Sequence, residues 1–347
     1  MEFLEVDGSQ GEGGGQILRT AVSFSSILGK PVRVANIRAG RETPGLKRQH
    51  VSALQVLAKV FCGELEGAEI GSSAVTFAPG SQKVEALSID MGTAASITLV
   101  LQAVVPAVAL AHSRLSIDLE GGTDVPWSPT FDYFQHVLRE AFSSIGIVFE
   151  LSAERRGYYP RGGGHVSAVI QPSRGIVPLD LTTKPRVPGA MLVSRCGRLP
   201  RHVAERQIAS ASAQLSASGM NVLVSAVSEE QSDSPGSSIL AYFTGNGGFL
   251  GGDSIGERGK PAEEVGKEAA MRFASAANSG AAVDPNLADM IIPLLSLAGG
   301  PSRVRVPMVT EHLKSGLHLA AQFTSCRWSV VDEGKTEVVE ITPAKTR

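Results

Sequence analysis

The stretch that decides the fold is FLEVDGSQGEGGGQILRTAVSFSSIL, residues 3–28. Its first four residues, Phe3–Val6, favour a short strand, and a glycine-rich loop follows. Apolar residues then recur at helical spacing from Gly15 to Leu28, and Gly29 suits the left-handed position that ends a helix. The stretch therefore predicts a strand, a glycine-rich turn and an amphipathic helix, in that order.

The same kind of pattern extends outward and then recurs along the chain. A strand at Val32–Ala35, a helix at Pro44–Phe61 and strands at Glu64–Ile70 and Ala74–Phe77 complete a β-α-β-α-β-β unit. The second unit is expected at Ala86–Ile89, Ala94–Ala111, Arg114–Ile117, Thr130–Ser144, Ile147–Leu151 and His165–Ile170. A third, partial unit is expected at Asn286–Leu297, Ser302–Val306, Glu311–Phe323, Arg327–Val331 and Glu337–Ile341. Recurrence of one unit indicates a repeat architecture.

The segment between the second and third units departs from this order. It predicts helices at His202–Ser218 and Pro261–Ala277 and strands near Asn221–Ala226 and Ser238–Thr244. We therefore expect an α+β fold of three repeats, about residues 1–80, 84–175 and 279–347, with one smaller inserted α/β domain. The main domain is expected to comprise residues 1–181 and 279–347, and the insert residues 182–278.

Composition excludes several classes of protein. The 347 residues include 32 Lys and Arg against 34 Asp and Glu, a formal net charge of -2, which excludes a polycationic nucleic-acid coat and an acidic tail protein. Hydrophobic residues make up 43% and charged residues 19%, as in ordinary folded chains. The 38 glycines fall largely in short clusters, which favours functional loops over linkers. Any contact with nucleic acid is therefore expected to be local.

The sequence also predicts a compartment. The three cysteines are widely separated and form no CxxC pair, which favours a reduced, intracellular protein. The N-terminal segment carries acids and lacks the basic and apolar regions of a secretory signal. The longest apolar run, Ile97–Ala111, contains Gln102 and Pro106 and is shorter than the roughly 20 residues that cross a membrane. We expect a cytoplasmic protein, or a nuclear one in a eukaryote, in which this run is a buried helix.

The glycine-rich segment Asp7–Gln16 follows a strand and opens a helix, where backbone N–H groups and the helix dipole favour anions. It lacks the third glycine of a dinucleotide fingerprint and the Gly-Lys-Ser/Thr of a P-loop. The carboxylate of Glu12, among the glycines, opposes direct phosphate binding unless a metal ion lies between them. Glu12 is therefore a candidate ligand for Mg²⁺ or Mn²⁺. The alternative is a tight glycine turn with a solvated glutamate.

A basic cluster follows the second predicted strand. Residues 38–50, RAGRETPGLKRQH, hold five basic or imidazole side chains around a Pro-Gly turn, and Arg19 on the preceding helix is expected to join them. Guanidinium groups match the geometry of phosphate oxygens. A solvated basic face is the alternative, but the near-zero net charge makes two such clusters beside glycine loops more indicative of a phosphate site.

His312 is the histidine whose position suits a nucleophile. Thr310 is expected to cap a helix that begins with Glu311, which places the imidazole of His312 in the first turn. The positive end of the helix dipole favours the neutral ring that a nucleophile requires. A helical histidine that only packs against its neighbours remains the alternative from position alone. The seven histidines include no HExxH pair.

Six segments, in order, resemble the RNA 3′-terminal phosphate cyclase family: DGSQGEGGGQILRTA, IRAGRETPGLKRQH, LEGGTDVPWSP, GYYPRGGG, PRHVAERQ and TEHLKSGLH. They span essentially the whole chain. The resemblance implies three β-α-β-α-β-β repeats, akin to an initiation-factor C-terminal domain and to enolpyruvyl transferases, with one inserted α/β domain. It also implies a reaction in which a histidine takes AMP from ATP, AMP passes to an RNA 3′-phosphate, and the 2′-OH closes a 2′,3′-cyclic phosphate.

By the same resemblance, His312 is the adenylated nucleophile and Glu12 the ligand of a divalent metal, Mg or Mn. The residues implied to handle phosphates are Arg19, Arg38, Arg41, Gln49 and His50. The residues implied to contact the nucleotide are Gln102, Pro129, Asn286, Leu287, Ala288, Asp289 and Met290. Gln102 is expected to be a buried amide in an apolar helix, and such an amide needs partners. Some relatives carry Tyr where this chain has Asn286, and no residue obviously substitutes.

Three other readings compete with an active cyclase. A cyclase-like ribosome-biogenesis protein has the same fold but lacks the nucleophilic histidine, which this chain has. An enolpyruvyl transferase needs six repeats, and a noncatalytic RNA-binding module would be richer in aromatic residues than 5%. The expected partners are RNA 3′-phosphate ends and ATP, with no membrane. The sequence leaves open the physiological RNA, ATP against GTP, the identity of the metal, the role of the insert and whether the chain forms a homodimer.

Overall fold

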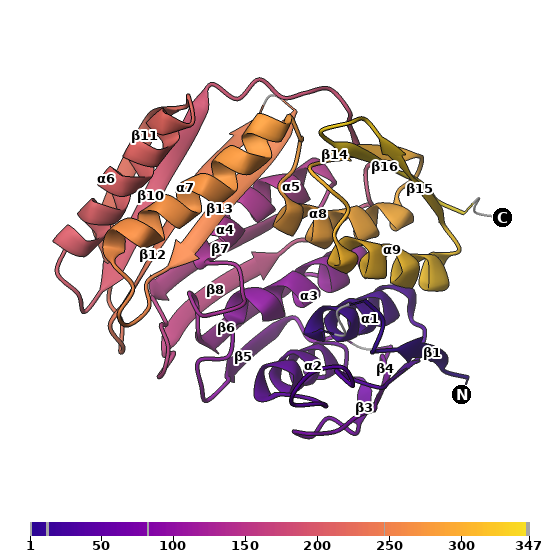
Figure 1. Cartoon of the computed structure of the whole chain (residues 1–347). Coiled ribbons are helices and arrows are strands. Elements are labelled where there is room, and N and C mark those ends of the chain that lie inside the picture. Colours follow the sequence, from indigo (N-terminus) through magenta and orange to yellow (C-terminus); the bar gives the residue numbers. More distant parts are fainter. Residues whose placement is uncertain (1, 12–13, 82, 246, 345–347) are drawn as a thin grey trace.

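A computed structural model describes residues 2–11, 14–81, 83–245 and 247–344. These residues form four four-stranded sheets with helices packed against them (Figure 1). The first unit consists of β1 (Leu4–Asp7), α1 (Gly15–Leu28), β2 (Val32–Ala35), α2 (Arg48–Val60), β3 (Glu64–Glu66) and β4 (Val75–Ala78). Its strand order is β1-β2-β4-β3, with β1 parallel to β2 and β4 antiparallel to both of its neighbours.

The second unit repeats this topology in the order β5-β6-β8-β7. Its elements are β5 (Ala86–Asp90), α3 (Ile97–Leu110), β6 (Leu115–Gly121), α4 (Phe131–Tyr133), the π-helical turn η1 (Phe134–Leu138), α5 (Arg139–Ser144), β7 (Phe149–Arg155) and β8 (Gly164–Ile170). Strands β5 and β6 are parallel, and β8 is antiparallel to β6 and β7. The two units therefore share one pattern of strand pairing.

The third unit has the same strand order, and it is complete. It contains β9 (Asp180–Leu181), α8 (Pro285–Ile291), the 3₁₀ helix η2 (Ile292–Leu297), β14 (Ser302–Val306), α9 (Glu311–Thr324), β15 (Arg327–Asp332) and β16 (Glu337–Thr342). Strand β9 pairs in parallel with β14, as β1 does with β2. Sequence patterns missed β9 because two residues are too few to show a period.

Between β9 and α8 the chain forms a fourth sheet, in the order β11-β10-β12-β13. This part contains β10 (Gly189–Gly197), α6 (His202–Ala217), β11 (Asn221–Glu229), β12 (Gly236–Gly245), β13 (Gly248–Ile255) and α7 (Ala262–Ser279). Helices α6 and α7 lie side by side over one face of the sheet (Figure 1). The fold is therefore α+β, with three like units and an inserted smaller α/β unit. The exact domain bounds stay a prediction.

Glycine explains two differences from the predicted elements. Helix α2 begins at Arg48 and not at Pro44, because Gly45 has a φ of 81°, outside the helical region. Strand β13 was not predicted, since its glycines are typical of turns. A side-chain carbon at Gly251 would press on the ring of Tyr133, so this glycine permits the close approach of β13 to the second unit.

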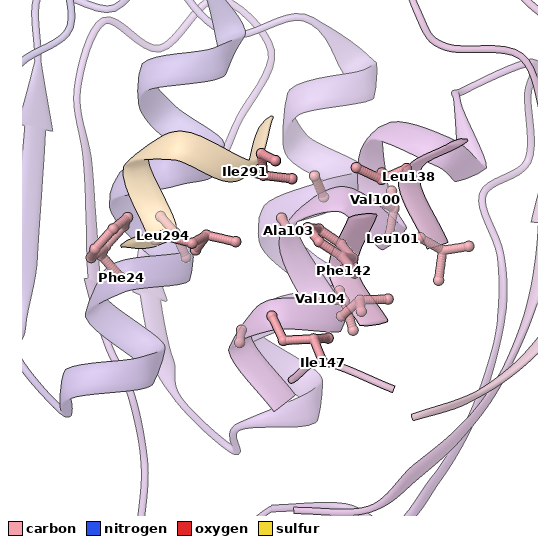
Figure 2. Packing of buried hydrophobic residues seen from close by; sticks show 14 of the residues in the cluster. Phe24, Val100, Leu101, Ala103, Val104, Leu138, Phe142, Ile147, Ile291 and Leu294 are labelled. Atoms are coloured by element: carbon pink, nitrogen blue, oxygen red, sulfur yellow. The ribbon is translucent and has the colours of Figure 1, made fainter. Parts of the chain in front are cut away.

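Helix α3 lies at the centre of the larger hydrophobic cluster. Figure 2 shows its side chains among those of α1, η2 and α5, with Phe24, Leu294 and Phe142 around it. Every residue of α3 is buried except Gln102. The apolar run is therefore a buried helix, as predicted, and Gln102 is its one partly exposed residue.

Candidate active site

The N-terminus of α9 holds His312 in its first turn. The Thr310 hydroxyl oxygen accepts a hydrogen bond from the Leu313 N–H at 2.9 Å, which caps the helix. The same hydroxyl donates to Asp289 Oδ1 at 2.6 Å. Because Asp289 lies on α8, this bond fixes the start of α9 to the helix before it. The predicted cap and the predicted place of His312 are both confirmed.

The glycine-rich loop lies against this turn of α9. Gly14 is the N-cap of α1, and a side-chain carbon built on it would lie 3.7 Å from His312 Cε1 and 3.9 Å from Arg41 Nη2. A carbon on Gly11, whose φ is 58°, would overlap Ser315 Oγ on α9. The loop thus brings His312 and Arg41 together over a glycine that leaves the space open. Glu12, the predicted metal ligand, lies outside the described residues.

A groove extends from His312 along α1. One hollow is lined by Gln10, Gly14, Ile17, His312, Ser315 and Gly316 together with Gln16 and Thr20. Gln16 and Thr20 also line a second hollow, whose other walls come from α3, α8 and η2. Figure 1 shows α1 beside both α3 and α9. We call these two adjoining hollows the α1 groove. Its lining residues extend from His312 on α9 to Gln102 on α3.

Arg19 is the cationic side chain of the α1 groove. It is half-buried, and no hydrogen bond or ion pair to its guanidinium occurs among the residues that the structure describes. Burial lowers the pKa of Arg19 to about 10, so it remains a cation at neutral pH. A partly desolvated cation without a carboxylate partner favours a bound anion.

The imidazole of His50 packs against Gly15, at the start of α1 and close to Arg19. Its Nδ1 accepts a hydrogen bond from the Lys47 N–H at 3.0 Å, so in the neutral ring Nε2 carries the proton. The pKa of His50 is lowered to about 3 by burial and by the positive charges of Arg19, Arg38 and Lys47. His50 is therefore a neutral donor at physiological pH. Gly15 allows this, because any β-carbon there would overlap the imidazole.

The other predicted phosphate residues are placed differently. Arg38 is buried, and its Nη1 donates to the carbonyls of Thr43 at 2.7 Å and Gly45 at 3.1 Å. Burial, and then the charge of Arg41, lower its pKa. Arg38 thus braces the loop that carries Arg41. Gln49 is half-buried on α2 and lines neither hollow.

The predicted nucleotide residues separate into two groups. Gln102, Asp289 and Met290 line the α1 groove, and Gln16 Nε2 donates to the Asp289 carbonyl at 3.4 Å. Gln102 was expected to be buried, but it is half-buried because it faces the groove. The four others line neither hollow: Leu287 and Ala288 are fully buried in the core, Asn286 is exposed, and Pro129 is half-buried.

Sequence reasoning missed Gln16, Thr20 and Ser315 as groove residues. A local signal existed for each of them. Ser315 lies three residues after His312, and Thr20 lies four residues after Gln16, so each pair shares a helix face. Gln16 and Thr20, which lie on the polar face of α1, were therefore candidates for residues that line the groove.

A second missed feature fixes the start of α8. Asp284 is its N-cap, accepting from the Leu287 N–H at 3.0 Å, the Gly251 N–H at 2.8 Å and the Tyr133 hydroxyl at 2.8 Å. Burial raises the pKa of Asp284 to about 6. Because α8 carries Asp289, contacts from the second unit and from β13 reach the α9 cap through one helix.

The described residues contain neither a metal-binding cluster nor a membrane-spanning helix. No group of three or more His, Cys, Asp and Glu suited to a metal occurs within residues 2–11, 14–81, 83–245 and 247–344. In the same ranges, no helix combines the length and apolar character needed to span a bilayer. The predicted metal site therefore stays untested, since its proposed ligand is Glu12.

Comparisons with known proteins identify the family. A crystal structure of the enolpyruvyl transferase NikO from Streptomyces tendae aligns with 98% of this chain and 66% of that chain, at 13% identity and a TM-score of 0.28, too low to support an argument. The RNA 3′-terminal phosphate cyclase of Caldivirga maquilingensis is 42% identical over 347 residues, 98% of each chain. That of Pyrococcus furiosus is 42% identical over 346 residues, 97% of this chain and 99% of the relative. A family model described as RNA 3′-terminal phosphate cyclase matches residues 10–330, and the chain therefore belongs to that family.

Proposed function

We propose that this protein converts an RNA 3′-phosphate into a 2′,3′-cyclic phosphodiester, with ATP going to AMP and pyrophosphate. The observation that carries the proposal is the α1 groove, which has His312 at one end and Arg19 and Gln102 further along. A nucleotide in this groove would meet a nucleophile and a cation that has no ion-pair partner among the described residues. Family membership supports the RNA end as the second substrate.

In the proposed first step, a ring nitrogen of His312 attacks the α-phosphorus of ATP. The bond from that phosphorus to the bridging oxygen breaks, and pyrophosphate leaves with the electron pair. The groove aids this step through Arg19 and Arg41, which stabilise negative charge on the phosphates. Gly14 helps by adding no side chain where a tetrahedral phosphorus must approach His312.

The bound AMP then becomes the activating group. An oxygen of the RNA 3′-phosphate attacks the α-phosphorus, and the phosphorus–nitrogen bond breaks to free His312. In the RNA-adenylate, the 2′-OH attacks the RNA phosphorus, loses its proton, and displaces AMP. A phosphate monoester dianion has no good leaving group, whereas the adenylate carries AMP, so this last step needs chiefly positioning.

Among the described residues, Gln102 and Asp289 supply an amide and a carboxylate in the hollow that α1 forms with α3 and α8. We propose that they contact the nucleoside, and that His50 donates from Nε2 near the phosphates. A divalent cation, Mg²⁺ or Mn²⁺, would neutralise phosphate charge, and Glu12 is its proposed ligand. The carboxylate and phosphate oxygens that this arrangement offers are ligands that both ions accept.

The direct test is self-adenylation without RNA. Purified protein is incubated with ATP labelled with ³²P at the α-phosphate and a divalent metal, and label on the protein is tested for acid lability and alkali stability. A histidine phosphoramidate is acid-labile and alkali-stable. We expect label with these properties on the wild type and none on His312→Ala. His318→Ala is the matched control, since His318 is an exposed histidine of the same helix.

A 3′-phosphorylated oligoribonucleotide then tests the second half of the reaction. The wild type and His318→Ala should both form the cyclic end, and His312→Ala should not. No label on the wild type, with ATP binding intact, would contradict this proposal. That result would favour the alternative function, a catalytically inactive cyclase-like protein of RNA processing.

A further inference from the structure

Trp127 is the most exposed large hydrophobic residue of the described part, with 93% of its surface accessible. It also has a φ of 61°, in the left-handed region that bulky side chains seldom adopt. An indole usually gains stability by burial, and here it is instead held outward on an unfavourable backbone. Such a strained, exposed residue requires surroundings that enforce its conformation.

Those surroundings are rigid on both sides of Trp127. Before it, the Thr123 and Asp124 N–H groups donate to the Gly157 carbonyl at 2.8 and 3.1 Å. After it, the Ser128 hydroxyl donates to the Val125 carbonyl at 2.8 Å, and the Thr130 N–H donates to Asp253 Oδ2 at 2.8 Å. The indole is therefore presented on a preorganised loop, which lowers the entropy cost of binding a ligand.

The loop adjoins the α1 groove. The Pro129 carbonyl accepts a hydrogen bond from the Thr98 hydroxyl at 2.8 Å. Thr98 precedes Gln102 by about one turn of α3, and Gln102 lines the groove. Trp127 is two residues from Pro129 but lines neither hollow. It therefore lies outside the groove, on the loop that the Thr98–Pro129 bond joins to α3.

A second exposed aromatic residue, Tyr159, lies on the loop that is bonded to the loop of Trp127. Tyr159, 70% exposed, belongs to the loop that receives the Asp124 and Thr123 bonds, and Asp124 bridges to its neighbour Tyr158. Arg161 in the same loop is exposed, and its guanidinium forms no ion pair with any described carboxylate. The two loops that carry Trp127, Tyr159 and Arg161 are therefore joined by backbone hydrogen bonds.

We infer that Trp127 and Tyr159 form a stacking surface for bases of the single-stranded RNA 3′ end, with Arg161 near the backbone phosphates. This inference rests on the proposed function. Stacking on aromatic rings beside basic side chains suits single-stranded RNA of any sequence. The proposed occupant is RNA and not ATP, because Trp127 lines neither hollow of the groove in which the mononucleotide is proposed to bind.

Tryptophan fluorescence tests this directly, since the chain has two tryptophans. Trp328 is half-buried and packs edge-on against His318, so Trp328→Phe leaves Trp127 as the reporter. A 3′-phosphorylated oligoribonucleotide is titrated without ATP, so that no turnover occurs. We expect quenching in Trp328→Phe and none in Trp127→Asn. Asparagine is chosen because it tolerates a positive φ and so preserves the loop.

Affinity gives the second readout. Trp127→Asn should weaken RNA binding roughly fivefold to a hundredfold, the range for loss of one stacked base. Tyr159→Ala should have a smaller effect, and Ile70→Ala, which removes an exposed side chain elsewhere, should have none. Trp127→Phe should recover part of the loss. Self-adenylation without RNA should be unchanged in all four variants.

Two results would overturn the inference. One is unaltered RNA affinity in Trp127→Asn together with no quenching in Trp328→Phe. The other is equal quenching by ATP alone, which would make the indole a contact of adenine. Failure of the proposed function has a different signature, because the wild type would then not self-adenylate whatever its RNA affinity.

Discussion

Two arginines on the same chain have opposite surroundings. Arg19 in the α1 groove is half-buried and unpaired among the described residues, and burial lowers its pKa. Arg156, 3% exposed beside the inserted sheet, binds Asp124 and Asp132 and lies 4.5 Å above the Phe131 ring. Burial alone would lower the pKa of Arg156, but the two carboxylates raise it.

The difference separates a binding site from a structural link. Arg156 has its anions within the protein, and Arg195 of β10 joins the same carboxylate of Asp132 at 3.3 Å, so this cluster ties the second unit to the insert. Arg19 has no such partner among the described residues, which suits a site where a ligand supplies the anion. A buried arginine indicates function only when the chain fails to neutralise it.

The largest effect should follow from breaking the structural cluster. Arg156→Met leaves the carboxylates of Asp124 and Asp132, each 2% exposed, without their main cation. We expect the free energy of unfolding to fall by about 3–5 kcal/mol, as when one partner of a buried ion pair is removed. Urea unfolding measures this change.

The matched control is Arg303→Met. Arg303 is half-exposed and pairs with Glu340 at 2.9 Å on the third sheet, so its loss should cost under about 1 kcal/mol. Adding Asp124→Asn to Arg156→Met should recover part of the stability. Equal losses for both arginines would contradict the structural role given to Arg156.

A smaller change, of the opposite kind, is expected at Arg19. Arg19→Met should leave stability unchanged or raise it, because it removes a desolvated charge that has no described partner. The rate of self-adenylation should fall about 10²-fold, the scale for losing one group that stabilises transition-state charge. Adenylation kinetics and urea unfolding on the same preparations measure both.

Arg33→Met is the control for Arg19, since Arg33 is exposed and pairs with Glu5 on the first sheet. It should alter neither quantity. If Arg19→Met destabilised the protein as much as Arg156→Met does, then Arg19 would be a structural residue and the comparison would fail.

Local patterns were enough to predict the parts of this site that lie within one element. Helix α1 runs from Gly15 to Leu28 as predicted, and Gly29 ends it with a φ of 64°. The Thr310 cap and the place of His312 also follow from a few neighbouring residues. Periodicity, caps and glycine turns act over a few residues, so one sequence suffices to show them.

The remainder depends on distant contacts. Nothing near Asp284 indicates that Tyr133 and Gly251 will bind its carboxylate, since they lie 151 and 33 residues away. Leu287 and Ala288 were grouped with Asp289 as nucleotide contacts, yet α8 turns them into the core. Which face of a short helix meets a groove is decided by packing, and sequence alone does not give it.

Asp284 extends the comparison to a carboxylate that is buried without a cation among its hydrogen-bond partners. Its pKa is about 6 when folded and 3.8 ordinarily, so the folded state binds the proton more tightly. The contribution of Asp284 to the free energy of unfolding is therefore largest at low pH. As the pH rises from 3.8 through 6, this free energy falls by up to about 3 kcal/mol. Asp284→Asn keeps a capping oxygen and should remove this loss.

Urea unfolding from pH 5 to pH 8 measures it. The free-energy difference between Asp284→Asn and wild type should shift in favour of the variant as pH rises. Asp180→Asn on β9 is the control, since its side chain is exposed. If the difference in free energy of unfolding between Asp284→Asn and wild type did not depend on pH, Asp284 would be ionised throughout this range. Its three hydrogen-bond donors would then be enough to stabilise the buried carboxylate.

The smallest expected effect is a change in the pKa of His50 when Arg19 is replaced. Burial is the main cause of the low pKa of His50, about 3, and the charge of Arg19 is the next. Arg19→Met should therefore raise that pKa while leaving it below the ordinary 6.5. Two-dimensional NMR of the imidazole Cε1–H, from pH 2 to pH 7, follows His50 in both proteins.

This change in His50 also makes a prediction about anions. Since a bound phosphate would offset the same positive charge, inorganic pyrophosphate should raise the pKa of His50 in the wild type and have less effect in Arg19→Met. If pyrophosphate left the pKa of His50 unchanged in the wild type, pyrophosphate would not be binding near Arg19. The proposal that Arg19 binds a phosphate anion would then be contradicted.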